Sequence, residues 1–188
     1  MIILGIDEAG RGPLIGPVVI AGVIFNENCT INGLTDSKKL SEKKRELLYN
    51  EIIEKAKYYA IEEVSTEDVD TMNILQATLY GMKLVADKLV YKFDKVLVDG
   101  NKLPNWQYNS EAIIKGDTKI PEISAASILA KVHRDRICLE YSKLYPEYDF
   151  DKHKGYPTKL HLEKLKEFGV LDIYRKTYRP VRDIIENN

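Results

Sequence analysis

The chain has 188 residues, of which 44% are hydrophobic and 30% are charged, and its formal net charge at pH 7 is −1. This length supports one domain with a substantial core and argues against two full-sized domains. No apolar run approaches the roughly 20 residues of a membrane-spanning helix, and the opening MIILGIDEAG lacks the features of a signal peptide. Cys29 and Cys138 belong to no CxxC pair, which indicates neither a zinc site nor a disulfide framework. We therefore expect a cytoplasmic protein without membrane contact.

The small net charge conceals an uneven distribution. Residues 131–182 carry 13 Lys and Arg against 8 Asp and Glu. A basic segment of this kind suits a polyanionic partner. Solvated helix faces would produce the same excess, and charge alone favours this second interpretation.

Short apolar and β-branched runs predict five strands, at residues 2–7, 17–25, 58–64, 95–99 and 112–115. The first two are joined by a glycine-rich segment, which predicts a hairpin-like start rather than a βαβ unit.

Apolar residues at helical spacing predict four helices, at residues 41–56, 65–89, 121–145 and 158–168. Ser41 and Ser65 are placed to cap the first two helices, and Gly169 to end the last. The alternation of strands and helices predicts an α/β domain, residues 1–145, with a helical C-terminal extension, residues 146–188, packed on it.

Carboxylates follow three of the predicted strands: Asp7 and Glu8 after the first, Asp99 after the fourth, and Asp117 just beyond the last. Ligand sites in α/β folds form at strand ends, and converging carboxylates repel one another unless a cation neutralises them. Hard oxygen ligands suit Mg²⁺ or Mn²⁺, and two such ions can cleave a phosphodiester. Taken singly, each acid is better explained as a turn or cap residue, whereas four acids after apolar strands favour a metal site.

The loop GIDEAGRGPLIGP contains Gly10, Gly12 and Gly16. It is not a dinucleotide-binding GxGxxG, because Ile15 stands where the third glycine belongs, and it is not a P-loop. Two glycines around Arg11 expose backbone that can approach a sugar or phosphate closely. A simple tight turn is the alternative.

Six segments of the chain resemble, in order, the signature blocks of the ribonuclease HII family. They are GIDEAGRGPLIGPVV, TDSKKLS, NILQAT, VLVDGNKLP, IKGDTKIPEISAASILAKVHRDR and KHKGYPT. The resemblance implies a ribonuclease H-like mixed sheet flanked by helices, with a helical C-terminal extension. It implies an endoribonuclease that cuts the RNA strand of RNA–DNA hybrids, and duplex DNA 5′ to embedded ribonucleotides, leaving 3′-OH and 5′-phosphate ends.

The same resemblance assigns roles to individual residues. Asp7, Glu8, Asp99 and Asp117 match the family's catalytic, metal-binding acids, for Mg²⁺ or Mn²⁺ in a two-metal mechanism. Substrate contacts are implied for the sugar-recognising group Gly10, Arg11, Gly12 and Tyr156, and we add the lysines Lys38, Lys39 and Lys131 as phosphate contacts. A monomer is expected, with a sliding clamp as a further partner.

Other polar residues are less distinctive. Arg134 is a further candidate for a phosphate contact, and Ser37 is expected to be a turn or cap residue with a phosphate contact as the alternative. His133, His153 and His161 have no metal-ligand spacing and are expected at the surface. Pro121-Glu122 departs from the family pattern; the proline suits a first helical turn, and Glu122 is expected to face solvent.

Two other functions are alternatives. A non-catalytic nucleic-acid-binding domain would keep the basic segment but need not keep all four acids. A small-molecule nucleotide phosphotransferase would need a phosphate cradle such as a P-loop, and the sequence lacks one.

Overall fold

The computed structural model describes the backbone of residues 1–188 and all side chains except those of Asp36 and Ser37. The expectation for Ser37 therefore falls outside the described side chains. Five strands form one mixed sheet in the order β3-β2-β1-β4-β5. Their bounds are β1 (Ile3–Ala9), β2 (Val18–Ile24), β3 (Tyr58–Val64), β4 (Lys95–Asp99) and β5 (Ser110–Ile113).

The sheet combines antiparallel and parallel pairing. β2 pairs antiparallel with both β1 and β3, and the β1–β2 pair forms the predicted hairpin around the glycine-rich loop. β4 lies parallel to β1, and β5 parallel to β4. Every residue of β2 is buried, as expected for a central strand whose two faces are both covered.

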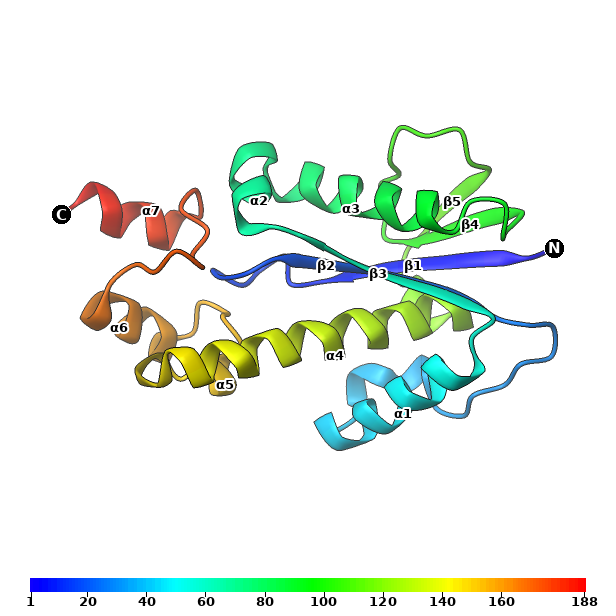
Figure 1. The fold of residues 1–188 in the computed structure, drawn as a ribbon, viewed down its shortest axis with the longest axis horizontal. Coiled ribbons are helices and arrows are strands. Elements are labelled where there is room, and N and C mark those ends of the chain that lie inside the picture. Colours follow the sequence, from blue (N-terminus) through cyan, green and yellow to red (C-terminus); the bar gives the residue numbers. More distant parts are fainter.

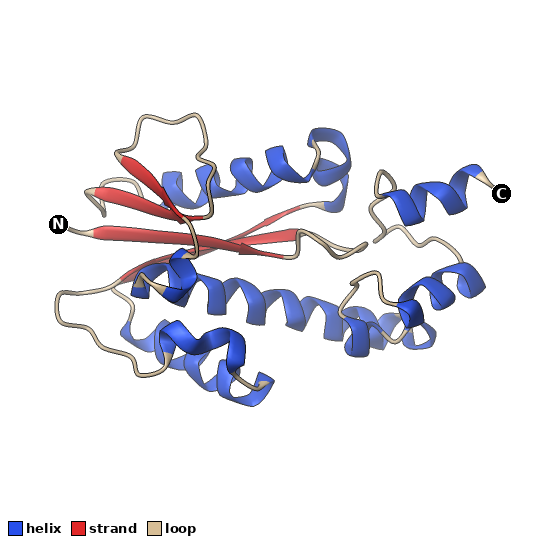
Figure 2. Ribbon diagram, turned by 180° about the vertical axis from the view of Figure 1, so that it is seen from behind, coloured by secondary structure: helices blue, strands red, loops and turns tan.

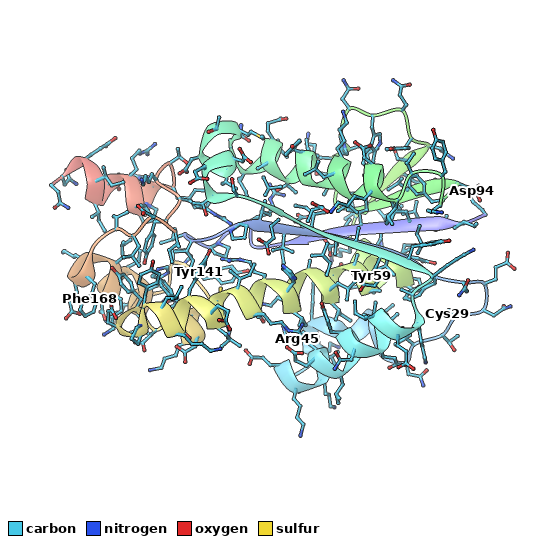
Figure 3. All side chains as sticks on the ribbon, in the orientation of Figure 1. Cys29, Arg45, Tyr59, Asp94, Tyr141 and Phe168 are labelled. Atoms are coloured by element: carbon cyan, nitrogen blue, oxygen red, sulfur yellow. The ribbon has the colours of Figure 1, made fainter. Side chains whose placement is uncertain are left out.

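Helices cover both faces of the sheet (Figures 1 and 2), and side chains lie between the helices and the sheet (Figure 3). One face carries α2 (Thr66–Met72) and α3 (Ile74–Lys88), while the other carries α4 (Pro121–Leu144) and, beside it, α1 (Glu42–Lys55). α4 lies so close to β1 that a side chain at Gly5 would collide with the backbone of α4. The α/β prediction is confirmed, and Ser41 caps α1 as expected. None of the described helices is long and apolar enough to cross a membrane.

Two predicted elements were wrong in detail. The single helix expected at residues 65–89 is broken at Asn73, whose φ is 75°. Asn73 ends α2, and its side chain accepts a hydrogen bond from the Gln76 amide to begin α3. The last strand begins at Ser110 rather than Ala112, and Lys115 after it adopts a left-handed conformation.

Beyond the β1–β2 loop lie three C-terminal helices, α5 (Phe150–His153), α6 (Lys159–Phe168) and α7 (Arg179–Glu186). Only α6 was predicted, because α5 is a single turn and α7 has only eight residues. Their buried side chains form a separate cluster with Leu14 and Ile15 of the glycine-rich loop. The C-terminal region therefore packs directly on that loop, although the division of the chain at residue 145 stays a prediction.

Candidate active site

The four predicted acids lie at one end of the sheet. β1 and β4 are parallel neighbours, so Asp7, Glu8 and Asp99 occur at the same ends of their strands. Asp117 follows in a short 3₁₀ turn (Gly116–Thr118), where its backbone N–H donates to Asp99 Oδ1 at 3.2 Å. The first strand extends past the acids to Ala9 rather than ending at them.

Asp7 and Glu8 point to opposite faces of the sheet, since successive strand side chains alternate. Asp7 pairs in register with Ala21, which packs in the cluster beneath α4, whereas Glu8 pairs with Ile20, which packs beneath α3. The acidic group therefore wraps around the end of β1.

Burial and mutual repulsion perturb these carboxyl groups. Burial raises the pKa of Asp7 well above its usual value, and the charges of Glu8 and Asp99 raise it further. Burial also raises the pKa of Glu8, against the lowering effect of Arg11, whose guanidinium lies 3.6 Å from the Glu8 carboxylate. The pKa of Asp99 is raised mainly by burial. Such perturbed carboxyls mark functional sites more often than structural ones.

The chemistry of this group fits a divalent cation. Its donors are all carboxylate oxygens, and the buried oxygens Glu8 Oε2 and Asp117 Oδ1 have no hydrogen-bond partner among the described residues. The ammonium of Lys38 lies 2.6 Å from Asp117 Oδ2 and is the positive charge paired with this acid. Among the described side chains, no three acids, histidines or cysteines stand close enough together to form a ready-made metal cage. Mg²⁺ does not require one, because it usually takes one or two carboxylates and completes its shell with water and phosphate oxygens.

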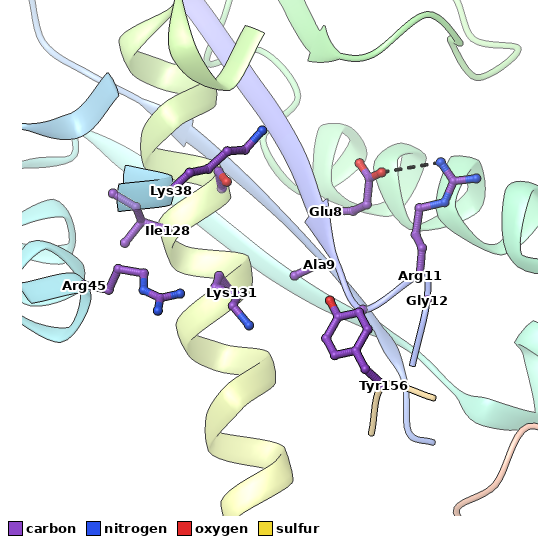
Figure 4. A pocket seen from close by; sticks show the side chains of 11 residues that line it. Glu8, Ala9, Arg11, Gly12, Lys38, Arg45, Ile128, Lys131 and Tyr156 are labelled. Atoms are coloured by element: carbon purple, nitrogen blue, oxygen red, sulfur yellow. Dashed lines mark ion pairs between the residues drawn. The ribbon is translucent and has the colours of Figure 1, made fainter. Parts of the chain in front are cut away.

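A groove of about 450 Å³ runs from Glu8 to the C-terminal region (Figure 4). Among the predicted residues, its lining includes Glu8, Gly10, Arg11, Gly12, Lys38, Lys131 and Tyr156. Arg45, Ser127 and Ile128 also line it and were not predicted. Lys39 is exposed and lies outside this lining.

The residues expected to recognise the sugar are adjacent. Tyr156 is 41% exposed, and its ring packs against the glycine-rich loop, where a Cβ added to Gly12 would lie 3.3 Å from its Cε1 atom. Lys131 shares the groove, and its ammonium pairs with Asp135 at 2.9 Å. Arg45 lines the same groove, and its buried Nε has no hydrogen-bond partner among the described residues.

The expectation that all three histidines lie at the surface was wrong for His153 and His161, which are buried. Their rings stack with centroids 3.9 Å apart. His161 Nδ1 lies 2.9 Å from the carbonyl oxygen of Tyr156, and the His153 ring accepts a hydrogen bond from the Gly155 amide. The pair therefore supports the loop that carries Tyr156.

Arg134, predicted as a candidate phosphate contact, does not line the groove. Its side chain is buried and donates to the carbonyl of Ile15. Glu122 is partly buried and lines a separate hollow with Met1 and Phe25, not the groove. Burial raises the pKa of Glu122, so it does not simply face solvent.

The additional lining residues differ in how clearly the sequence indicates them. Ser127 lies one helical turn before Lys131, so its presence on the same face of α4 was accessible from spacing. Arg45 follows Lys43 and Lys44 in one charged turn of α1, and nothing local distinguishes it from those lysines.

The comparisons with known proteins agree with this geometry. A model of the family described as Ribonuclease HII matches residues 4–181. The Ribonuclease HII of Francisella tularensis subsp. tularensis strain WY96-3418 is 68% identical over 185 residues, which cover 98% of this chain and 99% of that protein.

Two solved structures are similar over nearly the whole chain. The ribonuclease H2 of Pyrococcus horikoshii OT3 superposes with a TM-score of 0.83 at 30% identity, covering 100% of this chain and 98% of the other. A PCNA:RNase HII complex from Archaeoglobus fulgidus gives a TM-score of 0.76 at 28% identity, covering 95% and 96%. The chain therefore belongs to the ribonuclease HII family of endoribonucleases.

Proposed function

We propose that this chain cuts the RNA strand of RNA–DNA hybrids, and duplex DNA 5′ to embedded ribonucleotides, with divalent metal ions held by Asp7, Glu8, Asp99 and Asp117. The observation that carries the proposal is a buried, all-oxygen acidic group with unpartnered oxygens, part of which opens into a groove with basic walls. Both features belong to one end of the sheet, so the acids stand beside the expected path of the phosphate backbone.

Mg²⁺ or Mn²⁺ bound there would supply an activated water and neutralise charge on the scissile phosphate. The protein's own part is to hold the acids together against their repulsion. Lys38 offsets the charge of Asp117 through its 2.6 Å contact, and Arg11 offsets that of Glu8. Strand ends and the following 3₁₀ turn fix these groups on rigid backbone.

Other groups must select RNA over DNA, because the acids act on any phosphodiester placed beside them. We assign recognition of the ribose 2′-OH to the backbone of Gly10, Arg11 and Gly12 together with Tyr156. An exposed tyrosine can stack on a sugar or base and hydrogen-bond the 2′-OH, which distinguishes RNA from DNA. Lys131 and Arg45 are assigned to phosphates, which position the duplex without reporting its sequence.

Two partner assignments accompany this function. The chain acts as a monomer on its nucleic-acid substrate, and a sliding clamp is its protein partner. The second assignment draws on the Archaeoglobus fulgidus relative, whose structure is a complex with PCNA.

The variants Asp7→Asn and Asp99→Asn test the metal assignment. Both should abolish cleavage of a hybrid in Mg²⁺ or Mn²⁺, weaken Mn²⁺ binding in calorimetry, and leave hybrid binding nearly intact. Without metal, Asp7→Asn should melt at or above the wild-type temperature, because a buried like charge has been removed. Asp172→Asn, which changes an exposed acid outside the groove, is the control. Full activity in Asp99→Asn would refute the assignment. A folded wild type that binds hybrids but never cuts them would favour the alternative, a non-catalytic binding domain.

A further inference from the structure

The glycine-rich loop is organised around one buried side chain, Arg175, which lies 165 residues from Gly10. Arg175 is fully buried. Its Nη2 donates to the carbonyl of Gly10 at 2.6 Å, and its Nε to that of Gly16 at 2.9 Å. Its Nη1 lies within hydrogen-bond distance of the carbonyls of Arg11 (3.1 Å) and Pro13 (2.9 Å). Four carbonyls of one loop thus converge on a single guanidinium group.

The backbone around Arg175 reinforces this arrangement. The Arg175 amide donates to the carbonyl of Leu14, and the Gly16 amide donates to the carbonyl of Ile173, each at 2.8 Å. Residues 173–175 therefore run beside residues 14–16 as a short antiparallel bridge. The Tyr178 hydroxyl donates to the carbonyl of Arg11 at 2.6 Å and accepts from Arg175 Nη1 at 3.0 Å.

A second buried arginine lies against the same loop. Arg134 Nη2 donates to the carbonyl of Ile15 at 2.7 Å, while its Nε and Nη1 have no partner among the described residues. A Cβ at Gly10 would lie 2.6 Å from Arg134 Nε, and one at Gly16 would lie 2.7 Å from its Nη1. Both glycines also have positive φ, 90° and 73°, so the loop fits against Arg134 only with glycine at these positions.

The backbone amides of the loop differ from its carbonyls. Four carbonyls accept hydrogen bonds from Arg175, whereas the amides of Arg11 and Gly12 donate to no acceptor among the described residues. Both residues line the groove. Neither Arg134 nor Arg175 forms an ion pair with a described carboxylate. Unpaired amides, in a loop that packs on two guanidinium groups without a carboxylate at ion-pair distance, favour an electronegative ligand such as a sugar or phosphate oxygen.

We propose that Arg175 is a positioning residue for ribose recognition, which acts by holding the carbonyls of the glycine-rich loop inward so that the loop amides and Tyr156 meet the 2′-OH in a fixed geometry. This inference rests on the proposed function. It extends that function to a residue in the C-terminal region that does not line the groove. Stability alone is a weak explanation for burying an unpaired charge, because desolvating it is costly.

The test compares Arg175→Met and Arg175→Lys with Leu165→Ala. Leu165 is buried in the same C-terminal cluster but makes none of the loop hydrogen bonds, so its truncation destabilises the region without releasing the loop. The readouts are kcat and KM for a duplex with one ribonucleotide, thermal melting, and hydrogen exchange of the amides of residues 9–16. Displacing a reacting group by about 1 Å costs on the order of 100-fold in rate, and we expect Arg175→Met to lose at least that in kcat/KM.

Arg175→Lys, which keeps a charge but not the planar fork, should fall between Met and wild type. Exchange at Leu14 and Gly16 should accelerate in Arg175→Met. Leu165→Ala should stay within about threefold of wild type in activity at temperatures where it is folded. Unchanged kcat/KM in folded Arg175→Met would overturn the inference. The inference would also be overturned if Leu165→Ala and Arg175→Met had equal melting temperatures and lost the same factor in kcat/KM.

If Arg175→Met fails to fold, Tyr178→Phe decides. It removes one hydroxyl from a partly exposed side chain and should lower kcat/KM roughly fivefold, the worth of one hydrogen bond, with little change in melting; no change in activity would count against the proposal. Failure of the proposed function looks different. In that case the wild type would not cut at a ribonucleotide. Hydrogen exchange of the loop amides in Arg175→Lys would still show whether Arg175 holds the loop, because this readout does not depend on cleavage.

Discussion

Acid should destabilise this protein through His161. The ring is fully buried, and its Nε2 lies 2.7 Å from the Tyr174 hydroxyl. A carbonyl only accepts hydrogen bonds, so Nδ1, facing the Tyr156 carbonyl, carries the proton and Nε2 accepts from Tyr174. Burial, and secondarily the neighbouring His153, lowers the pKa of His161 from 6.5 to about 4. The neutral ring is therefore the folded form.

The magnitude follows from this shift. A difference of about 2.5 pH units corresponds to about 3 kcal/mol at 1.36 kcal/mol per unit. As the pH falls below about 6.5, the unfolded chain takes up a proton that the folded chain resists, so stability is lost progressively until the pH reaches about 4. Above about 6.5 this contribution is fully present. The pKa of His153 is also lowered by burial, which acts in the same direction.

Urea unfolding at pH 7.5 and 4.5 measures the effect. Between these values the wild type should lose about 2.5 kcal/mol more than His161→Asn, because pH 4.5 is still above the folded pKa and the effects of the carboxyl groups, common to both, cancel in the difference. His133→Asn, which removes a partly exposed ring, is the matched control and should follow the wild type. If wild type and His161→Asn lose equal stability on acidification, His161 does not hold a neutral, buried ring.

Three further substitutions test the groove and its loop. Lys131→Ala should weaken binding to hybrid and to plain duplex alike and reduce the slope of log affinity against log salt by about one unit. An unchanged slope would mean that Lys131 pairs with Asp135 and contacts no phosphate. Tyr156→Ala should lose most cleavage at a lone ribonucleotide, and Tyr156→Phe should fall between Tyr156→Ala and the wild type. If Tyr156→Ala cuts both this substrate and an all-RNA strand paired to DNA at wild-type rates, Tyr156 does not recognise the ribonucleotide. Gly10→Ala should destabilise the protein by about 1–3 kcal/mol and reduce cleavage on the order of 100-fold, since φ is 90° and a Cβ meets Arg134; a stable, active variant would show that the loop tolerates displacement.

Local patterns were sufficient for most of the fold and for the acidic group. β2 is a continuous apolar run and α4 has a proline in its first turn, and both elements were predicted within a residue. The acids were accessible because each lies at or just beyond the end of a recognisable strand. Asn73 was missed because a turn residue with positive φ interrupts a helix without interrupting its apolar spacing.

Long-range contacts account for the remaining errors. Arg134 reaches a carbonyl 119 residues away, and Arg175 reaches one 165 residues away. His161 is buried by Tyr174 and by stacking on His153. Arginine and histidine are usually exposed, so local sequence favours the surface. Only the packing of the C-terminal region against the glycine-rich loop reverses that expectation.

Cleavage of a DNA duplex carrying one ribonucleotide, with both ends of each product mapped, tests the central claim most directly. With Mg²⁺ or Mn²⁺ we expect a single cut 5′ to the ribonucleotide, leaving 3′-OH and 5′-phosphate ends. The matching all-DNA duplex should stay intact, and so should both duplexes in the presence of a chelator. Cutting without a divalent metal, or equal cutting of the all-DNA duplex, would contradict the account.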